Sequence, residues 1–135
     1  MKKIRKATLL LLVCSMLMGA VSVCAAGESF TFRFTSKNQK KPTTSYAKED
    51  NEQNAYVTLQ ELAESTFITG DVLGCRVRRA SDASAMTDYT LLREISRYVL
   101  PYTSTGYAGV SYYLVGQIDS TGMYDNLVAE GVWLP

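Results

Sequence analysis

The sequence contains no histidine and only three cysteines in 135 residues. Without an imidazole, the chain cannot assemble a Ser-His-Asp or Cys-His catalytic group, and it lacks the usual zinc ligand. It also contains no Gly-rich phosphate-binding loop and no dinucleotide-binding fingerprint. These absences exclude the commonest nucleophilic, zinc-dependent and nucleotide-dependent mechanisms. The sequence therefore predicts no cofactor, no metal site and no enzyme of these classes.

The first 26 residues have the order of a secretory signal peptide. Residues 2–6 include four basic side chains, residues 7–23 carry no charge, and the small residues Ala25 and Ala26 follow. This basic, apolar, small-residue order predicts a signal helix that is cleaved after Ala26, or alternatively after Ala25, during export. We therefore expect a secreted, extracellular protein, with association to the cell wall as one variant.

Two other interpretations of the N-terminal segment stay open. The uncharged run of residues 7–23 reaches the lower length limit of a membrane-spanning helix and would anchor the chain if it were not cleaved. Cys24 could instead carry a lipid, but the β-branched Val23 before it fits poorly with the small residue that signal cleavage prefers. Cleavage remains the favoured interpretation.

Removal of Met1–Ala26 leaves one domain of 109 residues, which is large enough to bury a core. Ten basic and 13 acidic residues then give a formal charge of −3. A weakly acidic domain is a poor candidate for binding nucleic acid or an anionic membrane, so membrane contact is expected only through an uncleaved N-terminal segment. Cys75 is the only cysteine left; we expect a buried apolar role for it, with an intermolecular disulfide as the alternative.

Five segments alternate apolar and polar residues with the period of a strand that is buried on one face. The clearest is Ala108–Asp119, in which Val110, Tyr112 and Leu114 share a face. The predicted strands are Phe30–Phe34, Ala55–Leu62, Val72–Ala80, Ala108–Asp119 and Leu127–Leu134. The polar segments Thr35–Asn54, Ser81–Asp88 and Ser120–Asn126 are expected to be exposed loops or turns.

The segment Tyr89–Tyr102 fits two structures. At helical spacing, its leucine, isoleucine, tyrosine and valine residues form one apolar stripe. As strands, Thr90–Glu94 and Arg97–Tyr102 would be separated by a tight break near Ser96. Pro101 ends a helix but is tolerated at a strand end or on an edge strand. The local pattern alone slightly favours the helix.

Candidate ligand contacts lie among the arginines and tyrosines of the predicted strands and turns. They are Arg76, Arg78, Tyr107, Tyr113 and Tyr124. The two arginines, with neighbouring Arg79, could bind an anionic ligand, although such side chains more often decorate a solvent-facing sheet. The tyrosines offer contact area with a polar tip, unless they are ordinary sheet-face or core residues.

Paired carboxylates keep one enzymatic alternative open. Glu61 with Glu64, or Asp119 with Asp125, could serve glycoside hydrolysis at a suitable separation. The two aspartates fit better as side chains that fix a turn by accepting bonds from backbone N–H groups. A small carboxylate-dependent hydrolase is therefore a secondary hypothesis.

Several short motifs together resemble small secreted proteins of Gram-positive bacteria, of the lactococcin 972-like and DUF2712-like type. These motifs are the export signal, Phe30-x-Phe32-x-Phe34, residues 97–102 (RYVLPY), residues 106–114 (GYAGVSYYL) and the ending Gly131-Val132-Trp133-Leu134-Pro135. The resemblance implies a compact β-sandwich, and therefore strands rather than a helix over Tyr89–Tyr102. It also implies a bacteriocin-like protein that acts at the cell envelope.

We therefore expect one all-β domain over residues 27–135, an antiparallel β-sandwich of about six or seven strands. The expected function is non-enzymatic binding of a cell-wall or envelope component. The alternative is a self-associating extracellular structural protein, which would use an exposed edge strand, either Phe30–Phe34 or the C-terminal strand.

Overall fold

The computed structural model describes residues 27–36, 38–64, 72–118 and 127–135. Within these ranges the secondary structure consists of strands, without a helix, so the predicted all-β class is confirmed. The strands are β1 (Glu28–Phe34), β2 (Lys40–Pro42), β3 (Tyr46–Ala47), β4 (Asn54–Glu64), β5 (Leu73–Arg79), β6 (Thr90–Leu92), β7 (Arg97–Pro101), β8 (Ser111–Ile118) and β9 (Leu127–Leu134). The predicted signal helix and the predicted turn at 120–126 lie outside the described residues.

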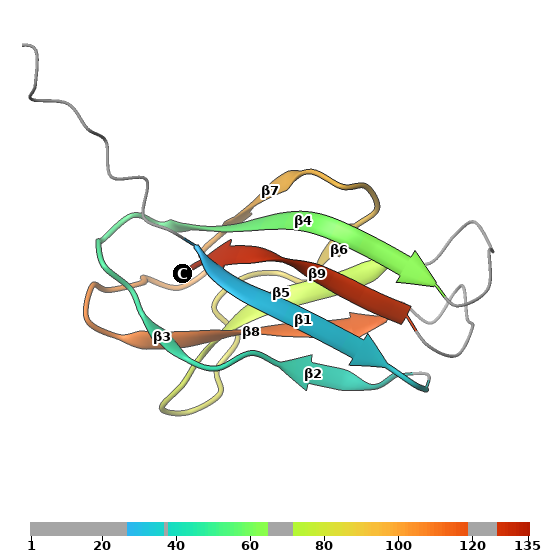
Figure 1. Cartoon of the computed structure of the whole chain (residues 1–135). Helices are drawn as coiled ribbons and strands as arrows, with labels where there is room; N and C mark the ends of the chain where they lie inside the picture. Colours follow the sequence, from blue (N-terminus) through green and yellow to red (C-terminus); the bar gives the residue numbers. More distant parts are fainter. Residues whose placement is uncertain (1–26, 37, 65–71, 119–126) are drawn as a thin grey trace, which may run out of the picture.

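The strands form two antiparallel sheets, which Figure 1 shows stacked one over the other. The first sheet has the order β1-β9-β4-β7, and the second has the order β2-β8-β5-β6, with β3 also paired to β8. The β-sandwich is therefore confirmed, with more strands than predicted because the short elements β2 and β3 add to the expected set.

The prediction of an exposed loop over Thr35–Asn54 was wrong in its middle, where β2 and β3 run along β8. Between them, the backbone N–H of Thr43 donates to the carbonyl of Leu114 at 2.8 Å, and beyond them Lys48 donates to Val110 at 2.9 Å. β2 and β3 thus form one edge of the second sheet, and their side chains are exposed or only partly buried. Their pairing therefore comes from the backbone and leaves no apolar alternation in the sequence.

The core lies between the two sheets and is built by the inward residues of each strand. From the first sheet it receives Phe30, Phe32, Phe34, Ala55, Val57, Leu59, Leu100, Leu127, Ala129 and Trp133; from the second sheet Leu73, Cys75, Val77, Leu92, Tyr112, Leu114 and Ile118. The alternation predicted for β5 and β8 is confirmed, since Leu73, Cys75 and Val77 are buried, as are Tyr112 and Leu114. Each buried side chain of this size contributes about 1.5–3 kcal/mol to the free energy of unfolding.

The segment Tyr89–Tyr102 forms strands, as the resemblance implied and against the local helical pattern. β6 pairs with β5 in the second sheet, whereas β7 pairs with β4 in the first, so the chain changes sheets between them. The Tyr98 hydroxyl fixes this crossing: it accepts from the backbone N–H of Glu94 at 2.9 Å and donates to the Glu94 carbonyl at 2.9 Å. Pro101 lies at the end of the edge strand β7, where its missing N–H breaks no sheet bond.

The two candidate edge strands have different positions. β1 is an edge of the first sheet, as the self-association alternative requires. The C-terminal strand β9 pairs with β1 on one side and with β4 on the other, so it is an inner strand and the prediction of an exposed C-terminal edge was wrong. Its inward Gly131 allows the close approach of Phe30 and the Thr58 carbonyl, which makes it a central element.

Candidate functional site

The described strands of the second sheet carry basic residues and no acidic one. The basic residues are Lys40, Lys41, Arg76, Arg78 and Arg79. Arg76 and Arg78 leave β5 on the side opposite the buried Cys75 and Val77, so the predicted outward orientation of both arginines is confirmed. Lys40, Arg76 and Arg78 lie on the outer face of this sheet, so its described strands give that face a positive charge.

A shallow groove of about 510 Å³ crosses this outer face. We call it the basic groove; its side chains include Lys40, Pro42, Thr43, Arg78, Tyr113 and Val115. Arg78 and Tyr113 are directly opposite each other in the β5–β8 pairing, so two of the predicted contact residues come together here. The Arg78 guanidinium donates to the Ala83 carbonyl at 2.6 Å, which uses one of its five N–H donors.

Arg76 lies beside this groove, opposite the groove residue Val115 in the β5–β8 pairing. Its guanidinium carbon is 5.6 Å from the centre of the Tyr89 ring, and its Nε is buried without a hydrogen-bond partner. Tyr89 lies over Gly74, where any Cβ would meet its hydroxyl at 1.8 Å. A glycine at this position therefore lets an aromatic ring cover the sheet next to Arg76.

The other predicted contacts do not join the basic groove. Tyr107 is exposed, with 56% of its surface accessible, and lies in the connection between β7 and β8; its backbone N–H donates to the Tyr112 hydroxyl at 3.0 Å. Tyr124 lies outside the described residues. The predicted set therefore splits into a groove pair, an adjacent arginine and a separate exposed tyrosine.

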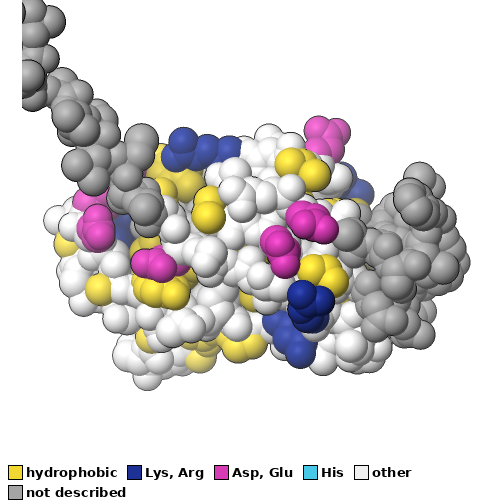
Figure 2. All heavy atoms as spheres, in the orientation of Figure 1, with side chains coloured by type: hydrophobic (Ala, Val, Ile, Leu, Met, Phe, Trp, Pro, Cys, Tyr) yellow, Lys and Arg dark blue, Asp and Glu magenta, His cyan; other side chains and the backbone are white. Residues whose placement is uncertain are grey.

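The carboxylate pairs expected for a hydrolase are only partly described. Glu61 is exposed on β4, while the side chain of Glu64 and the residues Asp119 and Asp125 lie outside what the structure describes. The pairing of β4 with β9 places Glu61 opposite Glu130, a carboxylate pair that sequence spacing did not predict. Both residues lie on the outer face of the first sheet and outside the two pockets. Figure 2 shows acidic, basic and hydrophobic side chains interspersed on this side of the molecule.

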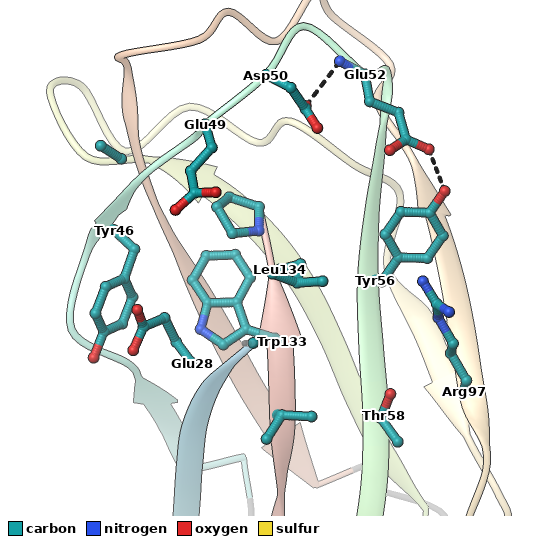
Figure 3. Close-up of a pocket in the computed structure, with 14 residues that line it drawn as sticks. Glu28, Tyr46, Glu49, Asp50, Glu52, Tyr56, Thr58, Arg97, Trp133 and Leu134 are labelled. Atoms are coloured by element: carbon teal, nitrogen blue, oxygen red, sulfur yellow. Dashed lines mark hydrogen bonds between the residues drawn. The ribbon is translucent and has the colours of Figure 1, made fainter. Parts of the chain in front are cut away.

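The sequence analysis missed a second hollow, also of about 510 Å³, at the end of the sandwich where β4 begins and β9 ends. We call it the acidic hollow. Its carboxylates are Glu28, Glu49, Asp50 and Glu52, and its larger side chains are Tyr46, Tyr56, Arg97, Trp133 and Leu134. Figure 3 shows these side chains converging from β1, β3, β4, β7, β9 and the β3–β4 connection. The charge run 49–52 was the only sequence signal, and it fitted a solvated loop better than a binding surface.

Lys48 binds two residues that line one wall of the acidic hollow, Asp50 and Pro135. Its side chain is 1% exposed, its ammonium is 3.0 Å from the Asp50 carboxylate, and it donates to the Pro135 carbonyl at 2.9 Å. It also lies 5.4 Å from the centre of the Tyr102 ring. The hydrogen bond from Lys48 lowers the pKa of Asp50, and the backbone N–H of Glu52 lowers it further. The β3–β4 connection is thereby tied to the end of β9.

The opposite wall is formed by Tyr56 and its two neighbours. The Tyr56 hydroxyl donates to the Glu52 carboxylate, which raises the pKa of that hydroxyl. The Arg97 guanidinium lies over the Tyr56 ring, 4.3 Å from its centre, in a cation–π contact. Glu52 and Arg97 therefore both have a partner within the hollow.

Cys75 is fully buried in the core, as predicted, and burial raises the pKa of its thiol to about 12. A thiol in this position is closed to an intermolecular disulfide. Among the described residues, no group of His, Cys, Asp and Glu side chains is placed to hold a metal ion. The described part of the chain also has no helix of the length and apolarity needed to cross a membrane.

Comparison with family models, curated proteins and solved structures finds no match to this chain. The resemblance to secreted lactococcin 972-like and DUF2712-like proteins therefore stays a prediction. The basic groove and the acidic hollow are therefore the features on which a function can be proposed.

Proposed function

We propose that the protein is exported, is not an enzyme, and binds an anionic component of the cell envelope through the basic groove. The observation that carries this proposal is the pairing of Arg78 with Tyr113 beside Lys40, on a sheet whose described strands contain no carboxylate. A phosphate-rich wall polymer has the matching chemistry, because guanidinium groups bind phosphate oxygens in a bidentate manner.

The geometry supports binding better than catalysis. The basic groove is shallow and open, and in the absence of histidine its side chains offer no general base of ordinary pKa near neutral pH. A flat cationic face with an aromatic side chain suits a repetitive polyanion, which needs charge complementarity along its length rather than an enclosed pocket. Because such contacts are electrostatic, the affinity should fall as the salt concentration rises.

The test uses the protein secreted from the full-length sequence by a Gram-positive host, with N-terminal sequencing of the product to check cleavage before Gly27. We expect this protein to sediment with purified cell walls, and to lose sedimentation when phosphodiester-linked polymers are stripped from the walls with cold hydrofluoric acid. Equal sedimentation with stripped walls would contradict an anionic wall ligand.

The matched variants separate the groove from general charge. Lys40→Gln with Arg78→Gln should weaken wall binding by about tenfold, which corresponds to about 1.4 kcal/mol. Arg33→Gln removes one exposed charge from the outer face of the first sheet and should leave wall binding nearly unchanged. Similar losses in both proteins would contradict a role for the groove. Growth inhibition of indicator cells would add bacteriocin-like activity to the binding function.

Self-association is the second candidate function, because one specific observation favours it. The edge strand β7 exposes Val99, and the turn before it exposes Ile95, with 52% and 66% of their surfaces accessible. An edge strand with apolar side chains is a template for pairing with another copy. Sedimentation equilibrium of the secreted protein and of Val99→Lys tests it: a dimer that the substitution abolishes would support self-association, and a monomer would contradict it.

A further inference from the structure

We propose that the acidic hollow is a second binding site, for a sugar that carries a free amino group. The proposal goes beyond the envelope function assigned to the basic groove, because the two sites share no residue and lie on different parts of the sandwich. It rests on unbalanced negative charge, on one buried donor without an acceptor, and on aromatic walls.

The first observation is that two carboxylates of the acidic hollow are left over. Asp50 is paired with Lys48, and Glu52 accepts from Tyr56. Glu28 and Glu49 have no hydrogen-bond or ion-pair partner among the described residues, and both point into the space shown in Figure 3. These two unpaired carboxylates leave the hollow with negative charge, which favours the binding of a cation.

The cation that fits is organic rather than a metal ion. The carboxylates come from β1 and from the β3–β4 connection, and they do not gather into a group that could hold a metal. A metal needs several oxygens within about 2.0–2.6 Å, whereas an ammonium group is satisfied by one or two carboxylates and can place its other donors toward solvent. An amine therefore satisfies Glu28 and Glu49 where a metal would not.

The second, independent observation is the indole of Trp133. This side chain is 1% exposed and lines the hollow, yet its Nε1–H has no acceptor. Figure 3 shows the indole nitrogen directed toward the side where Tyr46 and Glu28 lie. An unpaired buried donor is unfavourable, so a ligand oxygen placed there gains that contact once a side chain at the rim of the hollow turns aside.

The walls supply the apolar contact that a sugar ring needs. The Tyr46 ring meets the Trp133 ring edge to face at 6.3 Å between centres, and Tyr56 stands opposite with its ring fixed by Arg97. A sugar ring presents C–H groups to aromatic faces and hydroxyl groups at its edges. An amino sugar combines all three requirements: an ammonium for Glu28 and Glu49, an oxygen for the Trp133 N–H, and an apolar ring face.

The test uses the fluorescence of Trp133, which is the only tryptophan of the chain. The secreted full-length product is titrated with glucosamine, with N-acetylglucosamine and with the methylamide of N-acetyl-lysine. We expect glucosamine to change the emission saturably at roughly millimolar concentration, and the neutral N-acetylglucosamine to bind at least about tenfold more weakly. Equal binding of the two sugars would overturn the cation requirement, and equal binding of the lysine derivative would overturn the sugar.

Variants connect the signal to the site. Glu28→Gln or Glu49→Gln should weaken glucosamine binding by about fivefold, because each removes one charge-assisted contact. Glu61→Gln, which removes an exposed carboxylate outside the hollow, should have no effect and serves as the matched control. Lys40→Gln with Arg78→Gln should also leave glucosamine binding unchanged, so that failure of the groove and failure of the hollow can be distinguished. No fluorescence change with any of the three probes would overturn the proposal.

Discussion

The two sheets of the sandwich differ in the charge that their strands carry. The described strands of the second sheet contain lysines and arginines and no acidic residue. Those of the first sheet contain Glu28, Glu61, Glu64 and Glu130 together with Arg33 and Arg97. A formal charge of −3 for residues 27–135 averages over this separation. Net charge therefore disfavours an anionic partner only when charge is evenly spread, and here it is not.

The two hollows also differ in how they are held. The acidic hollow depends on Lys48, a buried cation with a fixed carboxylate and a fixed carbonyl as partners. The basic groove depends on Arg78 and Tyr113, which are half-exposed strand residues set by the β5–β8 register. The hollow should therefore be coupled to the stability of the fold, and the groove should be variable at little cost.

The largest expected effect compares a central glycine from each sheet. A Cβ on Gly131 would lie 2.2 Å from the backbone carbonyl oxygen of Thr58, whereas the nearest atoms to a Cβ on Gly74 belong to the side chain of Tyr89. Backbone cannot move aside as a half-exposed ring can. Gly131→Ala should therefore lower the free energy of unfolding by about 3 kcal/mol, and Gly74→Ala by less than about 1 kcal/mol. Urea denaturation of both variants measures the difference.

Gly74→Ala has a second consequence that sharpens the comparison. Displacement of Tyr89 would uncover Arg76, whose guanidinium it now contacts. The variant should keep its stability and change wall binding, whereas Gly131→Ala should lose stability first. Equal destabilisation by the two substitutions would show that the sheets are packed with similar tightness and would contradict the contrast.

The next effect compares the principal cation of each site. Lys48→Met keeps the buried stem but leaves the Pro135 carbonyl and the Asp50 carboxylate without their donor, so it should cost about 1–2 kcal/mol. Arg78→Met removes a half-exposed contact to the Ala83 carbonyl and should cost less than about 1 kcal/mol. Thermal unfolding of both variants, monitored by circular dichroism, checks the order. A larger loss for Arg78→Met would reverse the assignment of the structural cation.

The stability of Lys48→Met should also depend on pH. In the folded protein the pKa of Asp50 is lowered from its ordinary value of 3.8, and the largest cause is the hydrogen bond that Asp50 accepts from Lys48. A lowered carboxyl pKa stabilises the fold above the unfolded-state value and loses that contribution as the pH falls through the folded-state value. The stability gap between the native protein and Lys48→Met should therefore narrow below pH 3.8. A gap independent of pH would assign the whole effect to the Pro135 carbonyl.

Five of the strands were predictable because each buries one face and exposes the other, which writes a period of two into the sequence. β2 and β3 were not, because an edge strand held by backbone bonds has no buried face to mark it. Over Tyr89–Tyr102 the helical stripe was misleading, since Ile95 and Val99 are exposed while Leu92 and Leu100 are buried in different sheets. Only the tertiary fold separates these positions.

The sites follow the same rule. Arg76, Arg78 and Tyr113 were identified because strand alternation turned them away from the core. Their neighbour Lys40 was not, because it depends on the pairing of β2 with β8. The acidic hollow combines segments from both ends of the domain, and its Trp133 was assigned to the last strand and to the terminal motif but not to a site. The sequence pattern predicts on which face of its strand a residue lies, but it does not predict which residues of neighbouring strands lie beside it.

The smallest expected effect concerns the like-charged pair on the first sheet. Glu61 and Glu130 are directly opposite in the β4–β9 pairing. Among the described residues, Glu130 has only a 3.4 Å bond from the Thr31 hydroxyl to offset the repulsion. Opposite charges across a strand pair stabilise, and like charges destabilise, by about 0.2–1 kcal/mol. Glu130→Lys should therefore raise the free energy of unfolding by about 0.5 kcal/mol, measured by urea denaturation at low salt.

The gain should come from charge and not from the removal of Glu130 itself. Glu130→Gln, which removes the repulsion without adding attraction, should give a smaller gain than Glu130→Lys. At about 1 M salt, where the screening length is about 3 Å, the two variants should converge because exposed charges no longer interact across the strands. A loss of stability in Glu130→Lys at low salt would mean that other groups already offset the repulsion between Glu61 and Glu130. The charge contrast between the two sheets would then rest on the basic residues of the second sheet alone.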